Sequence, residues 1–296
     1  RQADIAMYKA KSDGKNRCCV FTKSMDADRG ETLEIVSELR DIVARKEIDI
    51  AYQPIVDAFS RKMTGVEALA RWPGGTGREI GPERFIASAE TAGIVNQLGE
   101  IILERACTDA MKWADLRVAI NISPLQLRDP EFVSRTLSII DRIGLAHGRI
   151  EFEITEGTLI DDVSRLKPVF AALRSVGISL ALDDFGAGYS SIAYLRELPF
   201  DRIKIDRSLT SAILVSGSAR HMIQATGLIA RGIGAEVTAE GVEAEEEIQI
   251  LKLAGCDKLQ GFLFGKPQDA NSITRALKSS TAATVAAQRR AQMGSR

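Results

Sequence analysis

Carboxylates, amides and one lysine stand where apolar segments of this 296-residue chain end. The most pronounced case is ALDDFGAGYSS, residues 181–191, in which Asp183 and Asp184 close an apolar run and a glycine-containing loop follows. Two adjacent carboxylates repel each other unless a cation lies beside them. Comparable groups close other apolar runs, namely Glu67, Asn121, Glu153, Lys204, Asp206, Glu240 and Gln260. A polar residue at the end of a strand is common in any protein. Because polar residues end so many successive strands here, the sequence predicts that they form one shared site.

The predicted ligands are all hard oxygen donors. Carboxylate and amide oxygens favour Mg²⁺ or Mn²⁺, with Ca²⁺ as a competitor, over zinc or copper. Adjacent aspartates allow one side chain to bridge two ions while the other binds only one. In such sites the ions lie ~3.5–4 Å apart and clamp the attacking and leaving oxygens of a phosphoryl displacement. The residue types therefore predict metal-dependent phosphoester hydrolysis.

The elements that must carry these residues are apolar strands separated mostly by amphipathic helices. Eight strands with intervening helices predict an α/β fold, a (β/α)8 TIM-like barrel, in which catalytic groups gather at the C-terminal ends of the strands. The first two strands are joined without a helix, which predicts an irregular start with one antiparallel strand. The expected strands are 50–56, 64–72, 117–123, 150–156, 178–184, 201–206, 235–240 and 258–264, and the expected helices are 82–92, 96–113, 130–142, 163–176, 219–233 and 245–254.

Alternation along a strand sends residues i and i+2 to the same face. Lys204 and Asp206 are therefore expected to point together, as are Glu151 and Glu153. Several carboxylates around one barrel mouth repel strongly unless cations neutralise them.

The composition excludes several classes of protein. Basic and acidic residues balance to a net charge of −1, which argues against a general binder of duplex nucleic acid or of membrane surfaces. With only two histidines, a His/Cys zinc cluster is not expected. The four cysteines form no CxxC pair and are interpreted as reduced thiols of a cytoplasmic protein. No apolar run approaches the ~18 residues of a membrane-spanning helix, and a signal peptide is not found.

The ends of the chain are expected to differ from the barrel, which is assigned to residues 31–267. Residues 1–22 are predicted to form a helix, a stop at Gly14 and a short strand, as the end of a domain whose body lies upstream. Because the chain begins with Arg1 rather than Met, we expect a fragment whose sensor or membrane anchor lies in the missing part. Residues 23–30 are interpreted as a linker. Residues 268–296 are interpreted as a basic tail, either a frayed helix or disordered.

A helix is expected to begin at Glu31, on an apolar stripe at helical spacing. The stripe consists of Leu33, Val36, Leu39 and Val43, widened by Ile35 and Ile42. It would pack on the barrel or on a partner.

The ordered set of motifs resembles the EAL domain family. The matching segments are YQPIVD, GVEALARW, NISPLQL, EFEITE, LALDDFGAGYSS, LPFDRIKIDRSL, AEGVE and GCDKLQGFLFGKP, in the family's order between Thr32 and Pro267. The resemblance implies a phosphodiesterase that opens cyclic di-GMP to the linear dinucleotide pGpG.

The same resemblance implies residue roles. One metal ion would be held by Glu67, Asn121, Glu153 and Asp183, and the other by Asp183, Asp184 and Glu240. Lys204 would orient or activate the hydrolytic water, with Gln260 in its polar network, so that the implied catalytic residues are Lys204, Glu67, Glu240 and Gln260. Substrate contacts would come from Gln53, Leu69, Arg71 and Asp206. Glu156 would fasten the loop after the paired aspartates, in which Gly186 and Gly188 permit movement and Ser190 or Ser191 caps the helix that follows.

Residues 1–22 resemble the end of a GGDEF domain, so the full-length protein is expected to carry that domain and a sensor upstream. Without the GGDEF active-site loop this chain would not synthesise the dinucleotide. The alternative function is a receptor that binds cyclic di-GMP without cleaving it and signals through a partner. A homodimer is compatible with either function. Ca²⁺ is expected to bind without supporting turnover.

Overall fold

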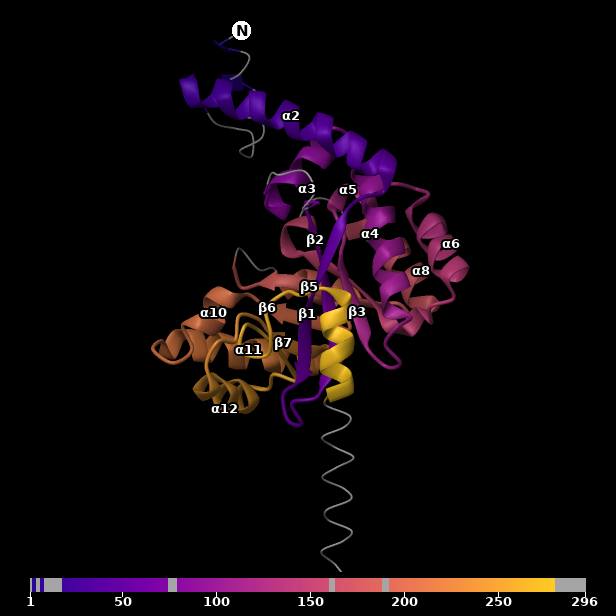
Figure 1. Ribbon diagram of the computed structural model, residues 1–296. Helices are drawn as coiled ribbons and strands as arrows, with labels where there is room; N and C mark the ends of the chain where they lie inside the picture. Colours follow the sequence, from indigo (N-terminus) through magenta and orange to yellow (C-terminus); the bar gives the residue numbers. More distant parts are fainter. Residues whose placement is uncertain are drawn as a thin grey trace, which may run out of the picture. The chain divides into compact units, whose positions relative to one another are not determined.

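The described part of the chain contains a closed barrel of eight strands, ordered β1 to β8 (Figure 1). The computed structural model describes residues 2–3, 6–7, 18–73, 79–159, 163–187 and 192–279. The strands are β1 (Asp49–Asp57), β2 (Met63–Arg71), β3 (Arg117–Asn121), β4 (Ile150–Thr155), β5 (Ser179–Phe185), β6 (Arg202–Ile205), β7 (Glu236–Ala239) and β8 (Lys258–Gln260). The predicted (β/α)8 barrel is confirmed, and every expected strand is present.

The irregular start is also confirmed. β1 pairs antiparallel with β8, with Ile55 opposite Gln260, whereas the pairs from β2–β3 to β7–β8 are parallel. The link between β1 and β2 is too short for a parallel crossover, which needs a dozen or more residues. Instead the Asp57 N–H donates to the Lys62 carbonyl at 2.9 Å and closes a tight turn.

Most of the predicted helices lie within a few residues of their expected bounds. The longer ones in the barrel region are α3 (Pro82–Thr91), α4 (Val95–Ala110), α6 (Phe132–Ile143), α8 (Val163–Ser175), α11 (Gly217–Ile233) and α12 (Glu245–Ala254). Short turns that the periodicity does not reveal are α5 (Pro124–Leu127), α7 (Glu156–Leu159), α9 (Ile192–Glu197), α10 (Arg207–Ser211) and the 3-10 turn η2 (His147–Arg149). Among the described helices, none is both long enough and apolar enough to cross a membrane.

The chain divides into two compact units. One comprises Arg1–Asp49 and Arg71–Leu98, and the other comprises Ile50–Ala70 and Gly99–Arg296. Nearly all strand residues and the candidate site, apart from Arg71, belong to the second unit.

In the first unit, α2 (Lys23–Arg45) corrects two expectations. The helix begins at Lys23 rather than Glu31, so residues 23–30 are helical rather than an extended linker. This stretch contains no proline, and its one glycine costs a helix only about 1 kcal/mol. The fully buried face consists of Ile35, Leu39 and Ile42, whereas Leu33 is 62% exposed. The buried residues all belong to the predicted stripe, and the structure corrects it only at Leu33, which lies on the exposed side of the helix.

Most of residues 1–17 lies outside the described residues, including the expected helix stop at Gly14. Residues 18–22 have no regular secondary structure, so the short strand expected there is wrong. The likeness of this segment to the end of a GGDEF domain stays a prediction.

The beginning of the C-terminal segment is packed, contrary to the expectation of a frayed or disordered tail. Gln268 and Tyr52 exchange two backbone hydrogen bonds at 2.7 and 3.0 Å, so chain pairing continues past the predicted barrel boundary. Residues 270–279 form a helix in which Ile273 is fully buried. The indole N–H of Trp113 donates to the hydroxyl of Thr274 at 3.0 Å. A single buried isoleucine and these hydrogen bonds fix a segment that composition describes as polar. Residues 280–296 lie outside the described part.

Side chains alternate between two environments along the strands. On β4 and β6, Phe152, Ile154, Ile203 and Ile205 are buried in the apolar core, and the polar residues between them turn to the other face. Because this second face lines the barrel interior, charged groups from different strands meet there.

Candidate active site

The predicted ligands converge inside the barrel near the C-terminal ends of the strands. Asn121 and Gln260 are the last residues of β3 and β8, and Glu240 follows the last residue of β7. Glu67, Glu153, Asp183, Lys204 and Gln260 are all buried. The structure therefore brings together residues that are separated by almost two hundred positions in the sequence.

The Lys204 ammonium lies at the centre of this cluster. Its Nζ is 2.6 Å from Glu240 Oε1, 2.9 Å from Glu153 Oε2 and 3.1 Å from Asp183 Oδ1. Glu67 Oε2 lies farther away, at 3.5 Å. The side chain of Lys204 is only 1% exposed, so water does not screen these contacts. Four carboxylates thus share one buried cation.

Amide groups hold the carboxylate of Glu67 in place. Asn121 Nδ2 donates to Glu67 Oε1 at 2.8 Å, and Gln260 Nε2 donates to Glu67 Oε2 at 2.6 Å. Because the Asn121 amide nitrogen is engaged in this way, its oxygen is the atom left for a metal ion. Gln260 Nε2 also lies 3.3 Å from Gln53 Oε1, which connects Gln53 to the cluster.

Local backbone geometry turns both adjacent aspartates toward the mouth. Regular alternation would send Asp183 and Asp184 to opposite faces of β5. The register between β5 and β6 shifts between Leu182 and Phe185, and Asp184 has a left-handed φ of 58°. Such an irregularity re-aims a side chain. As a result, ligand atoms of Asp183, Asp184 and Glu240 all lie within 4.8 Å of one another. The sequence predicted that both aspartates belong to the site, but it contained no signal for this bulge.

Burial and mutual repulsion disturb the ionisation of the cluster. Burial, together with the neighbouring Glu67, raises the pKa of Glu153 well above its ordinary value. Burial also raises the pKa of Glu240 to about 8, with Lys204 opposing the rise and Asp183 adding to it. Burial would lower the pKa of Lys204, but the surrounding carboxylates outweigh it and raise that pKa well above the usual range. One ammonium therefore faces more negative charge than it can neutralise.

The two remaining shifts follow the same physical causes. Burial and the adjacent Asp183 raise the pKa of Asp184. For Glu67, burial acts to raise the pKa, yet the Lys204 charge and the amide hydrogen bonds prevail and lower it. Glu153 Oε1 is buried without a hydrogen-bond partner among the described residues. Excess negative charge and an unpaired buried oxygen both fit a site that accepts divalent cations.

The other predicted site residues have different surroundings. Glu156 is buried as the first residue of α7, directly after β4. Residues 188–191, part of the loop that it would fasten, lie outside the described residues, as do the serines expected to cap α9. Asp206 is the N-cap of α10, where its side chain accepts from the Ser208 N–H at 2.9 Å. Leu69 lies in β2, and Arg71 ends that strand in the first compact unit. Their substrate contacts stay predictions.

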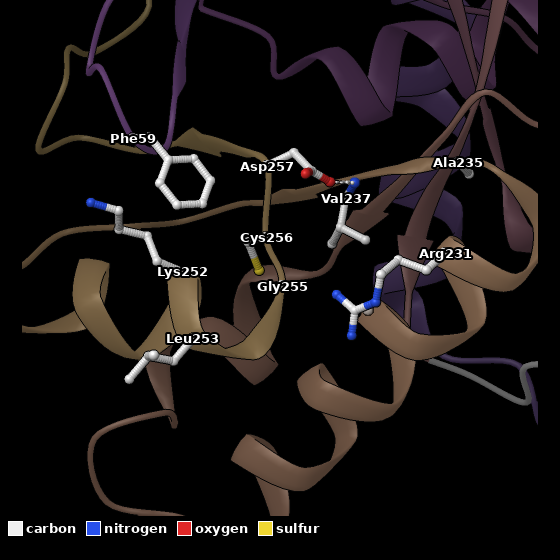
Figure 2. A pocket seen from close by; sticks show the side chains of 10 residues that line it. Phe59, Arg231, Ala235, Val237, Lys252, Leu253, Gly255, Cys256 and Asp257 are labelled. Atoms are coloured by element: carbon white, nitrogen blue, oxygen red, sulfur yellow. Dashed lines mark hydrogen bonds between the residues drawn. The ribbon is translucent and has the colours of Figure 1, made fainter.

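A pocket of about 250 Å³ lies beside the N-terminal ends of β7 and β8 (Figure 2). Its walls include Phe59 from the β1–β2 turn, Arg231 from α11, Lys252 from α12 and Cys256 just before β8. The Lys252 ammonium lies 5.2 Å from the centre of the Phe59 ring. None of the predicted site residues lines this pocket, so it is separate from the carboxylate cluster.

Fold and site together define a (β/α)8 barrel protein with a cluster of buried carboxylates at its mouth. The profile of the EAL domain matches residues 36–267. The chain therefore belongs to the EAL domain family, as the ordered motifs predicted.

Named relatives agree with this assignment. The bifunctional diguanylate cyclase/cyclic di-GMP phosphodiesterase MucR of Pseudomonas aeruginosa is 35% identical over 276 residues, which cover 92% of this chain and 40% of MucR. The cyclic di-GMP phosphodiesterase NbdA of the same organism is 34% identical over 272 residues, which cover 90% of this chain and 35% of NbdA. The chain thus spans less than half the length of either relative.

A solved structure matches the barrel closely. The PaMucR phosphodiesterase in complex with c-di-GMP superposes with a TM-score of 0.75 at 33% sequence identity. The match covers 81% of this chain and 99% of the MucR chain, so the likeness concerns the domain itself.

Proposed function

We propose that this EAL domain is a metal-dependent phosphodiesterase that hydrolyses cyclic di-GMP to linear pGpG and so lowers the level of this bacterial second messenger. The observation that carries the proposal is the intact cluster of Glu67, Glu153, Asp183 and Glu240 around the buried Lys204. The names of MucR and NbdA, both cyclic di-GMP phosphodiesterases, support the choice of substrate.

Two Mg²⁺ or Mn²⁺ ions would supply the Lewis-acid chemistry, by polarising the scissile phosphate and lowering the pKa of the hydrolytic water. The first would be held by Glu67, Asn121, Glu153 and Asp183, and the second by Asp183, Asp184 and Glu240. The excess negative charge of the cluster supports cation binding, and the all-oxygen donor set supports these metals.

The other steps of the reaction depend on side chains of the domain. Lys204 positions the hydrolytic water and holds or transfers its proton, and Gln260, which donates to Glu67, fixes the ligand beside it. Arg71 would contact a substrate phosphate through its planar fork, with Gln53, Leu69 and Asp206 as further substrate contacts. Glu156 would fasten the loop after the paired aspartates.

The competing function is that of a receptor that binds cyclic di-GMP without cleaving it. Every ligand position and the lysine are present in this chain, which favours hydrolysis. The test is chromatography of cyclic di-GMP after incubation with the domain and Mg²⁺, alongside calorimetric binding in Ca²⁺. Appearance of pGpG supports the phosphodiesterase. Binding in both metals with intact dinucleotide would establish the receptor instead.

Ca²⁺ is expected to support substrate binding but not turnover. It accepts longer and looser coordination than Mg²⁺ and acidifies bound water less. Calorimetry should therefore detect cyclic di-GMP binding in Ca²⁺, while chromatography finds no pGpG. Robust hydrolysis with Ca²⁺ as the sole divalent ion would contradict this account of the site.

We further infer that the domain acts in the cytoplasm as a homodimer, downstream of a GGDEF domain and a sensor. The bifunctional name of MucR and the likeness of residues 1–22 to the end of a GGDEF domain support the upstream partner. Exposed apolar side chains on α11 and α12, such as Leu228 and Leu253, support self-association. Sedimentation at several concentrations tests the dimer.

A further inference from the structure

A second layer of buried charge lies below the proposed catalytic layer, toward the N-terminal ends of the same strands. Arg202 precedes Lys204 by two residues on β6, and Glu151 precedes Glu153 by two residues on β4, so each pair shares the inward face. Arg202 Nε and Glu151 Oε2 are 3.2 Å apart, and their side chains are only 6% and 3% exposed.

The lower ion pair reaches across β5. Ala181 on that strand is paired with Glu153 on one side and with Arg202 on the other, and it is fully buried. A methyl group at this position leaves room for two long side chains to meet over it. Arg202 also contacts the partly exposed Glu236 on β7, with 2.8 Å between Nη2 and Oε2. The arginine therefore ties β4, β6 and β7 together.

Carboxylates of both layers compete for the Lys204 ammonium. Glu151 and Glu153 face the same way on one strand, and lysine carries a compact charge on a flexible stem. A buried carboxylate without a partner is strongly unfavourable and attracts any cation within reach. Arg202 engages Glu151, and its planar guanidinium spans from β4 to β7 as a shorter side chain would not.

We propose that Arg202 is a positioning residue. By neutralising Glu151, it keeps the Lys204 ammonium in the upper layer, in contact with Glu153, Asp183 and Glu240. The kinetic consequence rests on the proposed phosphodiesterase activity, in which Lys204 acts on the hydrolytic water. The position of the ammonium itself does not depend on that activity.

The test removes the lower cation and then its competitor. In Arg202→Met, Glu151 loses its partner and draws Lys204 downward. We expect kcat in Mg²⁺ to fall between about 10-fold and 100-fold, with KM nearly unchanged. This loss is smaller than the loss expected when an acid–base group is removed outright. Adding Glu151→Gln to this variant removes the competing charge and should restore most of kcat.

A matched control separates this effect from general damage. Arg174 forms an ion pair with Asp201 outside the barrel interior, at 2.7 Å, so Arg174→Met also breaks an arginine–carboxylate pair beside β6. It should leave kcat and KM unchanged. A crystal structure of Arg202→Met gives the direct readout, in which Lys204 Nζ is expected to approach Glu151 and to leave Glu240.

Each outcome decides the proposal. It is overturned if Lys204 keeps its upper contacts in Arg202→Met, or if kcat and KM deteriorate equally without rescue by Glu151→Gln. If Arg202→Met fails to fold, two other variants are compared with the wild type. These are the double variant, which leaves no unpaired buried charge, and Arg202→Lys. The double variant should then turn over near the wild-type rate. If the wild type itself does not hydrolyse cyclic di-GMP, the proposed function fails, and the crystallographic position of Lys204 still tests the role of Arg202.

Discussion

The two ends of this barrel use aspartate and glutamate in opposite ways. At the N-terminal end of the strands, Asp201 accepts from the Leu180 N–H at 2.9 Å and pairs with Arg174, and Asp257 accepts from the Val237 N–H at 2.8 Å. Each of these carboxylates has its own donors. At the C-terminal end, four carboxylates share the single ammonium of Lys204.

This difference separates stability from function. A carboxylate that accepts backbone N–H groups stabilises the strand that donates them. A carboxylate held among other carboxylates stores unfavourable charge that a divalent cation relieves. Barrel enzymes commonly place catalytic groups at the C-terminal face and stabilising groups at the other. Substitutions at the two ends should therefore damage different properties.

The largest effect is expected from Glu67→Ala, which should abolish measurable hydrolysis. The substitution removes a proposed metal ligand and leaves the amides of Asn121 and Gln260 without their shared acceptor. Circular dichroism should show the barrel retained, because the apolar faces of the strands are untouched. Turnover at the wild-type rate in saturating Mg²⁺ would remove Glu67 from the list of essential ligands.

Lys204→Ala should slow hydrolysis by ~10² or more, the usual scale for losing a positioned acid–base group. Cyclic di-GMP binding in Ca²⁺ should stay near normal, because the proposed metal ligands and Arg71 remain. Calorimetry and chromatography on the same preparation separate the two quantities. If binding and turnover fall together, the lysine holds the site together or clamps the substrate. If neither falls, Lys204 has no part in the reaction.

At the opposite end, Asp201→Ala should reverse this pattern. The Leu180 N–H and Arg174 lose their acceptor, which costs about 1–3 kcal/mol of unfolding free energy. For a chain of this size the midpoint of thermal unfolding should fall by roughly 2–4 °C per kcal/mol. Turnover per folded molecule should match the wild type. A loss of kcat in this variant at temperatures where it is fully folded would show that the two ends are not independent.

The sequence contained enough information to predict the barrel and the convergence of the proposed ligands at one of its ends. Strands such as 150–156 end in ionisable groups, and parallel strands of a barrel must bring those ends together. It also predicted the antiparallel start, because the short segment between Val56 and Thr64 leaves no room for a helix.

Other features depend on tertiary geometry that no local pattern encodes. The bulge that re-aims Asp184 arises from pairing between β5 and β6. The helix at 270–279 is fixed by one buried residue, Ile273, and by contacts with distant parts of the barrel. In the sequence, Arg202 is an ordinary charged residue at the start of a strand. Only the structure shows its ion pair with Glu151, which lies fifty-one positions earlier.

The smallest expected effect is a difference in how the two ends respond to pH when no metal is bound. At the N-terminal end, hydrogen bonds from Ser60 lower the pKa of Asp57 below its ordinary value of 3.8. The stabilisation from Asp57 is therefore complete above pH 3.8 and is lost only as the pH falls through its lower folded pKa. It does not change across the neutral range.

Glu240 behaves in the opposite sense because burial raises its pKa from 4.5 to about 8. Between those values the folded protein binds more protons than the unfolded chain, so its stability declines as the pH rises. The midpoint temperature of thermal unfolding in a chelator should accordingly fall as the pH rises from about 5 to about 8, and Glu240→Gln should flatten this decline. With Mg²⁺ the added stabilisation should grow with pH, because metal ligands must be deprotonated to bind. A chelated wild type that becomes more stable across this range would contradict the electrostatic picture of the cluster, since its carboxylates would then have been ionised without cost.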